Sequence, residues 1–559
     1  MADPEPAPAG PSGLSLAGLY RLPRRIAGRA SVEAGSALAL LRAGAFGVEP
    51  PQRLLRVLLA FEAYGPAGAA LAFACRRHPT RTAIIDEAGS ISFAELDERT
   101  GRLANALRER GFADGDSIGI LCRNHRGLFE ALFAAAKLGA RTVLLNTDFA
   151  GPQLADVCRR ERIALLIHDA EFATDGYQPP HGTVLADVGQ PATAEPQPDS
   201  IDALVAGQQS AKVRRPRRGQ QIVLLTSGTT GAPKGAAREF GTSLAIPGGY
   251  LSRIALRAQE NVFVAVPVFH AWGLLSSVIA LGLSDTLVLR RRPKPAEVAS
   301  CLQTYACDAL ITVPILLSRL LTELAEHPRE LPALRVAAVS GSALTPELAA
   351  RCRRQLGDVL YNLYGSTEVA YASIATPADL AAAPGSVGKP PLGTTVKILD
   401  EQGAPLPAGR TGRIFVGSGL QFGGYTGGGS KEQVGTLMST GDLGHLDDDG
   451  RLWIDGRDDE MIVSGGENVF PGEVEELLDS HPGIAEAAVV PVPDDDFGQR
   501  LRAYVVRGNG HGDDLDEAAV QGFVKQHLAR YKVPRDVRFL DALPRNPAGK
   551  VVKRELPTD

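Results

Sequence analysis

Short runs of apolar residues recur along the chain from about residue 80, and amphipathic stretches separate them. The amphipathic stretches carry leucines at helical spacing, as at Leu96, Leu103 and Leu107. Continuous apolar runs of this length are typical of strands covered on both faces, as in parallel sheets flanked by helices. The pattern predicts an α/β fold. The runs are Ile118–Cys122, Thr142–Asn146, Ile163–Ile167, Ile222–Leu225, Val262–Val266, Thr286–Leu289, Ala309–Val313 and Val336–Val339.

The chain changes character at the charged run Gly456–Glu460. About one hundred residues follow with their own helix signals at Pro471–Ser480 and Leu515–Ala529, and strand signals at Ala487–Val492 and Leu501–Val506. A chain of 559 residues also exceeds what one hydrophobic core supports. We therefore expect a large domain of mostly parallel sheets layered with helices and a small α+β C-terminal domain. The predicted divisions are 1–70 (tail and helical extension), 71–458 (large domain) and 459–559 (small domain).

The N-terminal extension is rich in proline and alanine over residues 1–13, which predicts a disordered tail rather than a signal peptide. Residues 14–64 combine leucine and alanine with seven arginines. Such a helical stretch either rests on an anionic membrane surface or packs on the main body, and we favour packing. Peripheral membrane contact through residues 14–64 stays open, as does the oligomeric state, a homodimer included.

Composition argues against several classes of protein. A net charge of -5 disfavours nucleic-acid binding. The longest apolar stretch, Ala271–Leu289, is interrupted by Asp285, so no membrane span is expected. Six cysteines without a C-x-x-C pair are typical of reduced thiols in a cytoplasmic protein, and they disfavour a cysteine metal site.

The segment Thr226–Gly235 is the strongest chemical signal. A buried strand runs into a loop of glycines, hydroxyls and one cation, Lys234. Glycine lets backbone N–H groups approach phosphate oxygens, hydroxyls add donors, and lysine adds charge. The order differs from that of P-loop NTPases, because Gly235 stands where their motif needs Ser or Thr. A plain surface loop would not explain this order of residues, so we interpret it as a polyphosphate cradle.

With five further motifs, the chain resembles the adenylate-forming enzymes, which include acyl- and aryl-CoA synthetases, luciferases and peptide-synthetase adenylation domains. The resemblance covers about residues 70–556, and within the superfamily it is greatest to bacterial fatty acyl-CoA synthetases. The further motifs are Pro267–His270, Tyr364–Glu368, Ser439–Asp442, Gly456–Asp459 and Pro544–Lys550.

The resemblance implies a set of residues that bind ATP or AMP. In the loop they are Thr226, Ser227, Gly228, Thr229, Thr230, Gly231 and Lys234, and elsewhere they are Ser342, Ala343, Asn362, Tyr364, Gly365, Ser366, Asp442 and Arg457. Asn362 and Tyr364 would contact adenine, Thr367 the α-phosphate, and Asp442 the ribose. Asp442 sits in a turn-rich segment, and its carboxylate suits the acceptance of hydrogen bonds from both ribose hydroxyls.

The resemblance also implies the catalytic and metal-binding residues. Glu368 would hold Mg²⁺ together with Thr229, since this cation takes oxygen ligands from protein and phosphate. Lys550 would neutralise the charge that develops during adenylation. By sequence position alone, Lys550 would be one of several basic residues in a solvated tail.

The acid and CoA sites are inferred from the same resemblance. His270, Trp272, Gly341 and Ser342 are candidates for the acyl pocket, with His270 also in the catalytic set; a core histidine and a core tryptophan are the alternative. Gly465, Gly466 and Glu467 would lie along the pantetheine arm of CoA. Asp459 would be the hinge about which a mobile small domain turns, exchanging Lys550 for Gly465 and Gly466 between two half-reactions.

We therefore expect an ATP- and Mg²⁺-dependent ligase that activates a carboxylic acid as acyl-AMP and transfers the acyl group to coenzyme A. The small residues near Gly341 and the N-terminal extension favour a medium- or long-chain fatty acid. An aryl-CoA ligase stays open, as does an adenylating enzyme that uses an amine, a carrier protein or another nucleophile. A non-catalytic relative is disfavoured because Lys234, Glu368 and Asp442 are all present.

Overall fold

The computed structural model describes the chain in separate ranges. They are residues 16–45, 51–172, 174, 176–186, 199–227, 233–238, 243–419, 421–457, 462–464, 467–469, 471–508, 515–544, 551 and 553–557.

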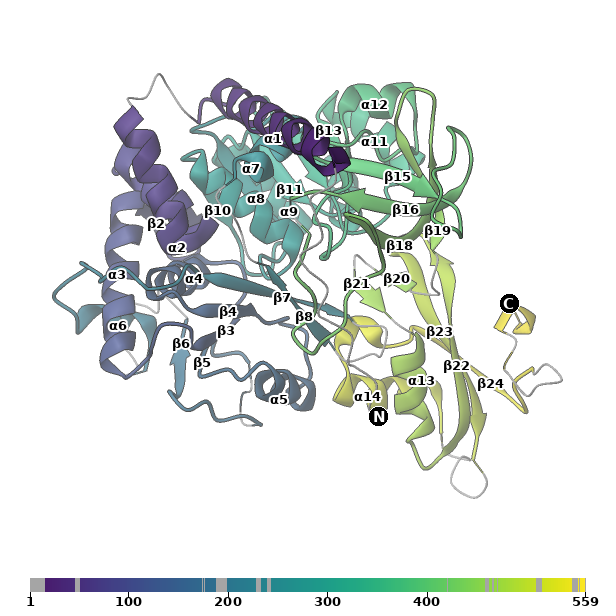
Figure 1. The fold of residues 1–559 in the computed structure, drawn as a ribbon. Helices are drawn as coiled ribbons and strands as arrows, with labels where there is room; N and C mark the ends of the chain where they lie inside the picture. Colours follow the sequence, from purple (N-terminus) through teal and green to yellow (C-terminus); the bar gives the residue numbers. More distant parts are fainter. Residues whose placement is uncertain are drawn as a thin grey trace, which may run out of the picture.

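Two mostly parallel sheets form the body of the molecule, and helices cover them (Figure 1). The larger has the order β14-β13-β12-β11-β9-β10-β1-β2, with β2 and β14 antiparallel at its edges. Its strands are β1 (Thr82–Asp86), β2 (Gly89–Ser92), β9 (Asn261–Val264), β10 (Thr286–Leu289), β11 (Ala309–Thr312), β12 (Val336–Val339), β13 (Leu360–Tyr364) and β14 (Ser373–Ala375).

The second sheet has the order β6-β5-β3-β4-β7-β8, and β8 is its antiparallel edge strand. Its strands are β3 (Ser117–Leu121), β4 (Arg141–Leu144), β5 (Leu165–His168), β6 (Thr183–Leu185), β7 (Gln221–Ser227) and β8 (Pro233–Arg238). Strand β8 follows β7 as a hairpin whose register pairs Thr226 with Lys234. The two ends of the predicted phosphate loop therefore lie in paired antiparallel strands.

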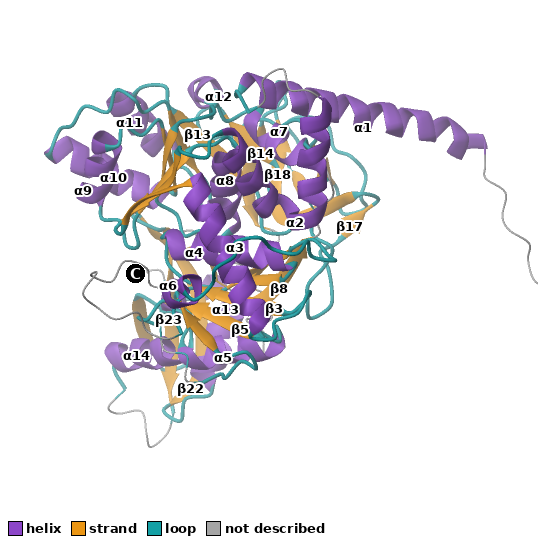
Figure 2. Ribbon diagram, turned by 90° about the vertical axis from the view of Figure 1, so that its left-hand side faces the viewer, coloured by secondary structure: helices purple, strands orange, loops and turns teal. Residues whose placement is uncertain are grey.

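The helices flank these sheets, and α4 contacts strands of both (Figures 1 and 2). They are α1 (Leu16–Arg42), α2 (Pro51–Arg77), α3 (Phe93–Glu109), α4 (Arg126–Leu138), α5 (Gly151–Arg160), α6 (Ile201–Ala206), α7 (Ala245–Leu251), α8 (Ala271–Gly282), α9 (Pro295–Thr304), α10 (Pro314–Glu326), α11 (Pro346–Leu356) and α12 (Pro377–Ala382). The α/β fold with mostly parallel sheets is confirmed.

An antiparallel sheet follows in the chain, with β15 (Thr395–Leu399), β16 (Gly412–Gly417), β17 (Gln433–Val434), β18 (Leu437–Leu446) and β19 (Leu452–Arg457). This sheet is not predicted by the sequence pattern. It also corrects the placement of Asp442, which lies within strand β18 and not in a turn. Strand β18 pairs with β16 and β19 with irregular register, and Gly441 has φ +85°. Pairing on both sides therefore keeps the glycine-rich segment extended.

The C-terminal residues form a smaller sheet with its own hydrophobic core. Its elements are β20 (Ile462–Ser464), β21 (Glu467–Val469), α13 (Pro471–Asp479), β22 (Ile484–Asp494), β23 (Gly498–Arg507), α14 (Glu517–His527), β24 (Asp536–Leu540) and the 3₁₀ turns η1 (Arg530–Lys532) and η2 (Lys553–Glu555). Both predicted helices and both predicted strands of this part are present.

The described part of the N-terminal extension forms α1 and residues 51–70 of α2. The C-terminal part of α1 packs against α7, where the Glu33 carboxylate accepts hydrogen bonds from Ser243 Oγ (2.6 Å) and Leu244 N–H (3.0 Å). Figure 2 shows the N-terminal part of α1 projecting from the body. The C-terminal part of α1 thus packs on the main body, as favoured above. Within the described ranges, we find no helix with the length and hydropathy that a membrane span requires.

Candidate functional site

Many of the predicted site residues meet in one large cavity of about 1350 Å³. They come from the loops after β12 and β13, the start of α8, the β7–β8 hairpin and strand β18. Loops at the carboxyl ends of parallel strands converge at one edge of a sheet, which explains how distant segments meet there. Those that line the cavity are Lys234, His270, Trp272, Gly341, Ser342, Ala343, Asn362, Tyr364, Gly365, Ser366, Thr367, Glu368 and Asp442.

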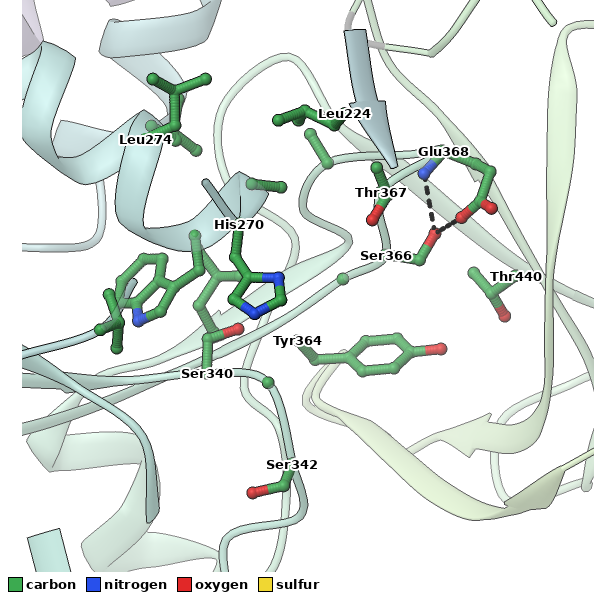
Figure 3. Close-up of a pocket in the computed structure, with 18 of the residues that line it drawn as sticks. Leu224, His270, Leu274, Ser340, Ser342, Tyr364, Ser366, Thr367, Glu368 and Thr440 are labelled. Carbon is green, nitrogen blue, oxygen red and sulfur yellow. Dashed lines mark hydrogen bonds between the residues drawn. The ribbon is translucent and has the colours of Figure 1, made fainter. Parts of the chain in front are cut away.

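Glu368 is held in place by two hydroxyl groups. Ser366 Oγ donates to Glu368 Oε2 over 2.8 Å (Figure 3). Tyr425 Oη donates to Glu368 Oε1 over 2.9 Å. Lys234 Nζ lies 5.5 Å from the centroid of the Tyr425 ring. Burial, together with the Glu368 carboxylate, raises the pKa of Tyr425 well above its usual range, so this hydroxyl stays a donor. The carboxylate is therefore fixed on both oxygens and faces the cavity.

The donor set at Glu368 fits a magnesium ion. An ionised carboxylate offers about four lone-pair sites, and Ser366 and Tyr425 occupy one on each oxygen. Each oxygen thus still has a lone pair with which it can coordinate a cation. Mg²⁺ prefers such oxygen ligands.

The loop that presents Glu368 is closely packed. A Cβ atom on Gly365 would lie 2.0 Å from the carbonyl oxygen of Ala370, so only glycine fits there. Ala370 itself adopts a positive φ of 65°. The Ser366 hydroxyl also accepts from the backbone N–H groups of Glu368 (3.3 Å) and Val369 (3.4 Å). These contacts set the direction in which Glu368 points.

Asp442 faces the same cavity from the antiparallel sheet. Tyr364 Oη donates a hydrogen bond to Asp442 Oδ2, which joins an aromatic ring at the end of β13 to a carboxylate on β18. Asp442 is paired across the sheet with Arg457, of which only the backbone is described. A flat ring beside a fixed carboxylate is an arrangement suited to a nucleoside.

His270 stands at the boundary between the polar and apolar parts of the cavity (Figure 3). It precedes α8 in an extended conformation and makes no capping hydrogen bond with its side chain. Its Nε2 lies 2.7 Å from Glu467 Oε1, and its ring centroid lies 4.4 Å from that of Phe269. Burial alone would lower the pKa of His270, but the carboxylates of Glu467 and Asp148 outweigh burial and raise it. Strand β21 of the C-terminal sheet thus reaches the cavity.

Trp272 is a wall of the cavity that is also part of the core. Its indole Nε1 donates to the carbonyl oxygen of Thr312 over 3.0 Å, and its ring lies 6.1 Å from that of Tyr250. Its side chain is buried. The indole is therefore fixed in one orientation. Trp272 both lines the cavity, as expected of a pocket residue, and packs in the core, as the alternative predicts.

Several predicted residues lie outside the described residues. They are Gly228, Thr229, Thr230, Gly231, Asp459, Gly465, Gly466 and Lys550. For Thr226 and Ser227 the backbone is described, as the end of β7.

Two further residues at the site, Tyr425 and Asp148, are not predicted by the sequence. Tyr425 follows a pair of glycines outside the six motifs, and Asp148 follows β4 with no other motif residue beside it. The role of Tyr425 depends on its hydrogen bond to Glu368, and that of Asp148 on charge interactions with His270 and Glu467, all far away in the chain. No local sequence pattern indicates such long-range interactions.

Comparison with known proteins gives the family of the chain. Residues 71–426 match the family described as AMP-binding enzyme, and residues 473–550 match the AMP-binding enzyme C-terminal domain. The chain is 33% identical over 493 residues to indoleacetate–CoA ligase of Aromatoleum aromaticum, covering 86% of this chain and 95% of that protein. It is 28% identical over 508 residues to the fatty acid–[acyl-carrier-protein] ligase ScoC of Streptomyces coeruleorubidus, covering 87% and 94%.

One solved enzyme aligns differently in two ligand states. A double mutant of o-succinylbenzoate CoA synthetase of Bacillus subtilis, bound to its product analogue OSB-NCoA, aligns with a TM-score of 0.76, 28% identity, and coverage of 87% of this chain and 98% of that chain. The same enzyme with the acyl-adenylate OSB-AMP aligns with a TM-score of 0.63, 27% identity, and coverage of 87% and 97%. Sequence identity and coverage are nearly equal in the two alignments, so the difference in TM-score reflects how the parts of the enzyme are arranged. The arrangement in this chain is more similar to that in the product-analogue complex.

Proposed function

The chain belongs to the AMP-binding enzyme family, and from that premise we propose that it joins a medium- or long-chain fatty acid to coenzyme A, with acyl-AMP as the intermediate. Its relatives include acyl- and aryl-CoA ligases that form AMP, and ATP, CoA and a small carboxylic acid are the substrates of such enzymes. The fatty acid is the finer part of the proposal. It rests on one observation: the cavity at Glu368 and Tyr364 continues past His270 along an apolar face of α8.

In the first half-reaction, a carboxylate oxygen of the acid attacks the α-phosphorus of ATP, and the bond to the bridging oxygen of pyrophosphate breaks. Tyr364 and Asn362 would hold adenine, and Asp442 would accept hydrogen bonds from the ribose. Lys234 would balance phosphate charge. Mg²⁺, when bound at Glu368, neutralises charge on the phosphate oxygens. The chain's contribution is thus positioning and electrostatics.

In the second half-reaction, the sulfur of CoA attacks the acyl carbonyl, the bond to AMP breaks, and the thiol proton leaves to solvent. The contact between His270 and Glu467 supports an arrangement in which strand β21 lies next to the acyl carbonyl carbon that the CoA sulfur attacks. By resemblance, Gly465 and Gly466 precede this strand as the passage for the pantetheine arm. We propose Asp459 as the hinge that exchanges this arrangement for one with Lys550 in the site.

We also propose that the enzyme works in the cytoplasm. All six cysteines lie in the described part of the chain, none forms a disulfide, and five of them are buried. Reduced, buried thiols are typical of proteins in a reducing compartment.

The proposal is tested by pyrophosphate release across a panel of fatty and aryl acids, with and without CoA, and with products identified by mass spectrometry. We expect fatty acyl-CoA and AMP. Adenylate without thioester would overturn the CoA assignment and favour another acceptor, such as the carrier protein in the name of ScoC.

The two half-reactions are separated by the variant Lys550→Ala. We expect it to lose pyrophosphate release by about 100-fold or more, while it still converts supplied acyl-AMP and CoA to thioester. Equal loss of both steps would refute the exchange of Lys550 for Gly465 and Gly466.

A further inference from the structure

Two helices ahead of the family-matched region contribute to the wall of the cavity. The family match begins at residue 71, within α2, so all of α1 and residues 51–70 of α2 lie outside it. Residues of both helices nevertheless line the same cavity as Glu368 and His270. They are Leu40 and Ala45 at the end of α1, and Phe61, Pro66, Ala67, Ala69 and Ala70 on α2.

The opposite wall is an apolar stripe along α8. The residues of α8 that line the cavity recur at helical spacing from Ala271 to Gly282, with Leu274, Leu275, Val278 and Ile279 between them. At 1.5 Å per residue, this stripe is about 16 Å long. An extended alkyl chain advances about 1.3 Å per carbon, so the stripe accommodates about a dozen methylenes.

Small residues face each other where α2 and α8 pack together. A Cβ atom built on Gly282 would lie 3.6 Å from Cβ of Ala70, its nearest neighbour. Ala67 and Ala69 add two more short side chains on α2. Larger side chains at these positions would fill the space between the two helices, so the cavity persists there because the residues are small.

The end of α1 closes this region at the far end of α8. Ala258 N–H donates to the carbonyl oxygen of Ala43 over 2.7 Å, and Gln259 N–H donates to that of Leu283 over 3.2 Å. The end of α1 therefore lies beside the end of α8 that is farthest from His270. The Arg77 guanidinium at the end of α2 donates to the carbonyl oxygen of Ala45, which joins the two N-terminal helices.

We infer that α1 and α2 form the distal wall of an acyl channel that begins at His270, and that they set the length of the unbranched aliphatic acid that the enzyme accepts. This inference rests on the proposed function. The ligand class follows from the lining: beyond His270 the named residues are apolar, and they belong to α8 and to the two N-terminal helices. Each further methylene buried there is expected to raise kcat/KM roughly fourfold.

The test is the dependence of kcat/KM on chain length, measured for saturated acids from six to eighteen carbons with the full chain. We expect wild type to gain with each methylene up to about a dozen carbons. Ala70→Leu and Gly282→Leu each place a branched side chain where α2 meets α8. Each should lower kcat/KM for hexadecanoic acid about 10-fold or more and leave that for octanoic acid within about twofold.

Matched variants separate the channel from a general loss of structure. Ala72→Leu adds the same side chain to α2 at a position that does not line the cavity, and it should leave the profile unchanged. Leu40→Ala removes bulk at the far end and should shift the optimum to longer acids. Retained activity on octanoic acid shows that each variant is folded.

The outcomes distinguish the inference from the proposed function. Equal effects of Ala70→Leu on short and long acids, or no effect on either, would overturn the channel. Thioester formation from aryl acids alone, without dependence on alkyl length, would overturn it while CoA ligation stands. No pyrophosphate release from any acid would instead refute the proposed function itself.

Discussion

Glu368 combines features that a surface carboxylate lacks. It is 8% exposed, it lines the cavity, and each of its oxygens accepts a hydrogen bond from a neutral hydroxyl rather than from a cation. Neutral donors orient a carboxylate without cancelling its charge. A carboxylate held in this way keeps its attraction for a metal ion that carries phosphate.

We therefore expect Glu368→Gln to lower kcat/KM for pyrophosphate release about 100-fold or more and to raise the Mg²⁺ concentration needed for half-maximal rate. An amide has the same size but no charge, so it would weaken cation binding with little change in packing. The measurement is pyrophosphate release against Mg²⁺. Glu401→Gln changes an exposed carboxylate in a turn and should match wild type. An unchanged Mg²⁺ dependence in Glu368→Gln would remove this residue from the metal site.

The pair of His270 and Glu467 predicts a pH dependence with a defined sign. The pair raises the pKa of His270 above its ordinary value of 6.5. A raised pKa means that the ion pair stabilises this arrangement fully below pH 6.5, and that the contribution is lost as pH rises through the raised pKa. Protonation of His270 thus favours the contact with β21.

Thioester formation from supplied acyl-AMP, measured as the ratio of wild type to Glu467→Gln, should be largest at low pH and fall toward one as pH rises. The ratio removes the pH dependence of the CoA thiol, which both proteins share. Glu330→Gln, an exposed carboxylate elsewhere, should give a ratio near one throughout. A ratio for Glu467→Gln that is flat with pH would contradict this role of the pair.

The start of α8 depends on a glycine. A Cβ atom on Gly273 would lie 2.4 Å from the carbonyl oxygen of Pro267, so Gly273→Ala forces the strand-to-helix turn apart. We expect it to destabilise the protein by about 1–3 kcal/mol in urea unfolding and to lower activity, because His270 lies in that turn. Gly282→Ala in the same helix meets only ordinary contact and should change stability by about 1 kcal/mol or less. Equal stabilities of the two variants would contradict this account.

The strands of the parallel sheets were predictable because each is a short apolar run between polar segments. The runs Thr286–Leu289 and Val336–Val339 coincide with β10 and β12. Strand β18 could not be predicted in the same way, since its glycines and aspartate disfavour strands locally. Its extended form depends on pairing with β16 and β19. Asp442 was therefore identified by resemblance but placed in the wrong kind of element.

The position of the N-terminal helices could not be predicted from the sequence, for a different reason. Glu33 on α1 bonds to Ser243, 210 residues later in the chain. A helical pattern indicates which residues share a face, but not what that face will contact. The same limit applies to Tyr425 and Asp148, whose interaction partners lie far away in the chain.

The C-terminal sheet completes the cavity rather than standing apart from it. Val463, Val490 and Gln499 of this sheet line the cavity together with residues of the large α/β part. Phe497 adds a second contact, because the Arg319 guanidinium on α10 lies 5.6 Å from its ring centroid. The higher TM-score with the product-analogue complex accords with this placement of the C-terminal sheet against the cavity. In our proposal this arrangement serves thioester formation, and adenylation uses another.

The contact of Arg319 with Phe497 then predicts an effect on one half-reaction alone. Arg319→Glu replaces attraction to the ring face by repulsion, so it should slow thioester formation from supplied acyl-AMP roughly threefold to tenfold. Pyrophosphate release in single turnover without CoA should stay within about twofold of wild type. Arg354→Glu makes the same charge change on exposed surface of α11 and should affect neither step. Two outcomes would contradict this prediction: equal slowing of both steps by Arg319→Glu, or slowing of pyrophosphate release alone. In either case the contact of Arg319 with Phe497 would not be specific to thioester formation.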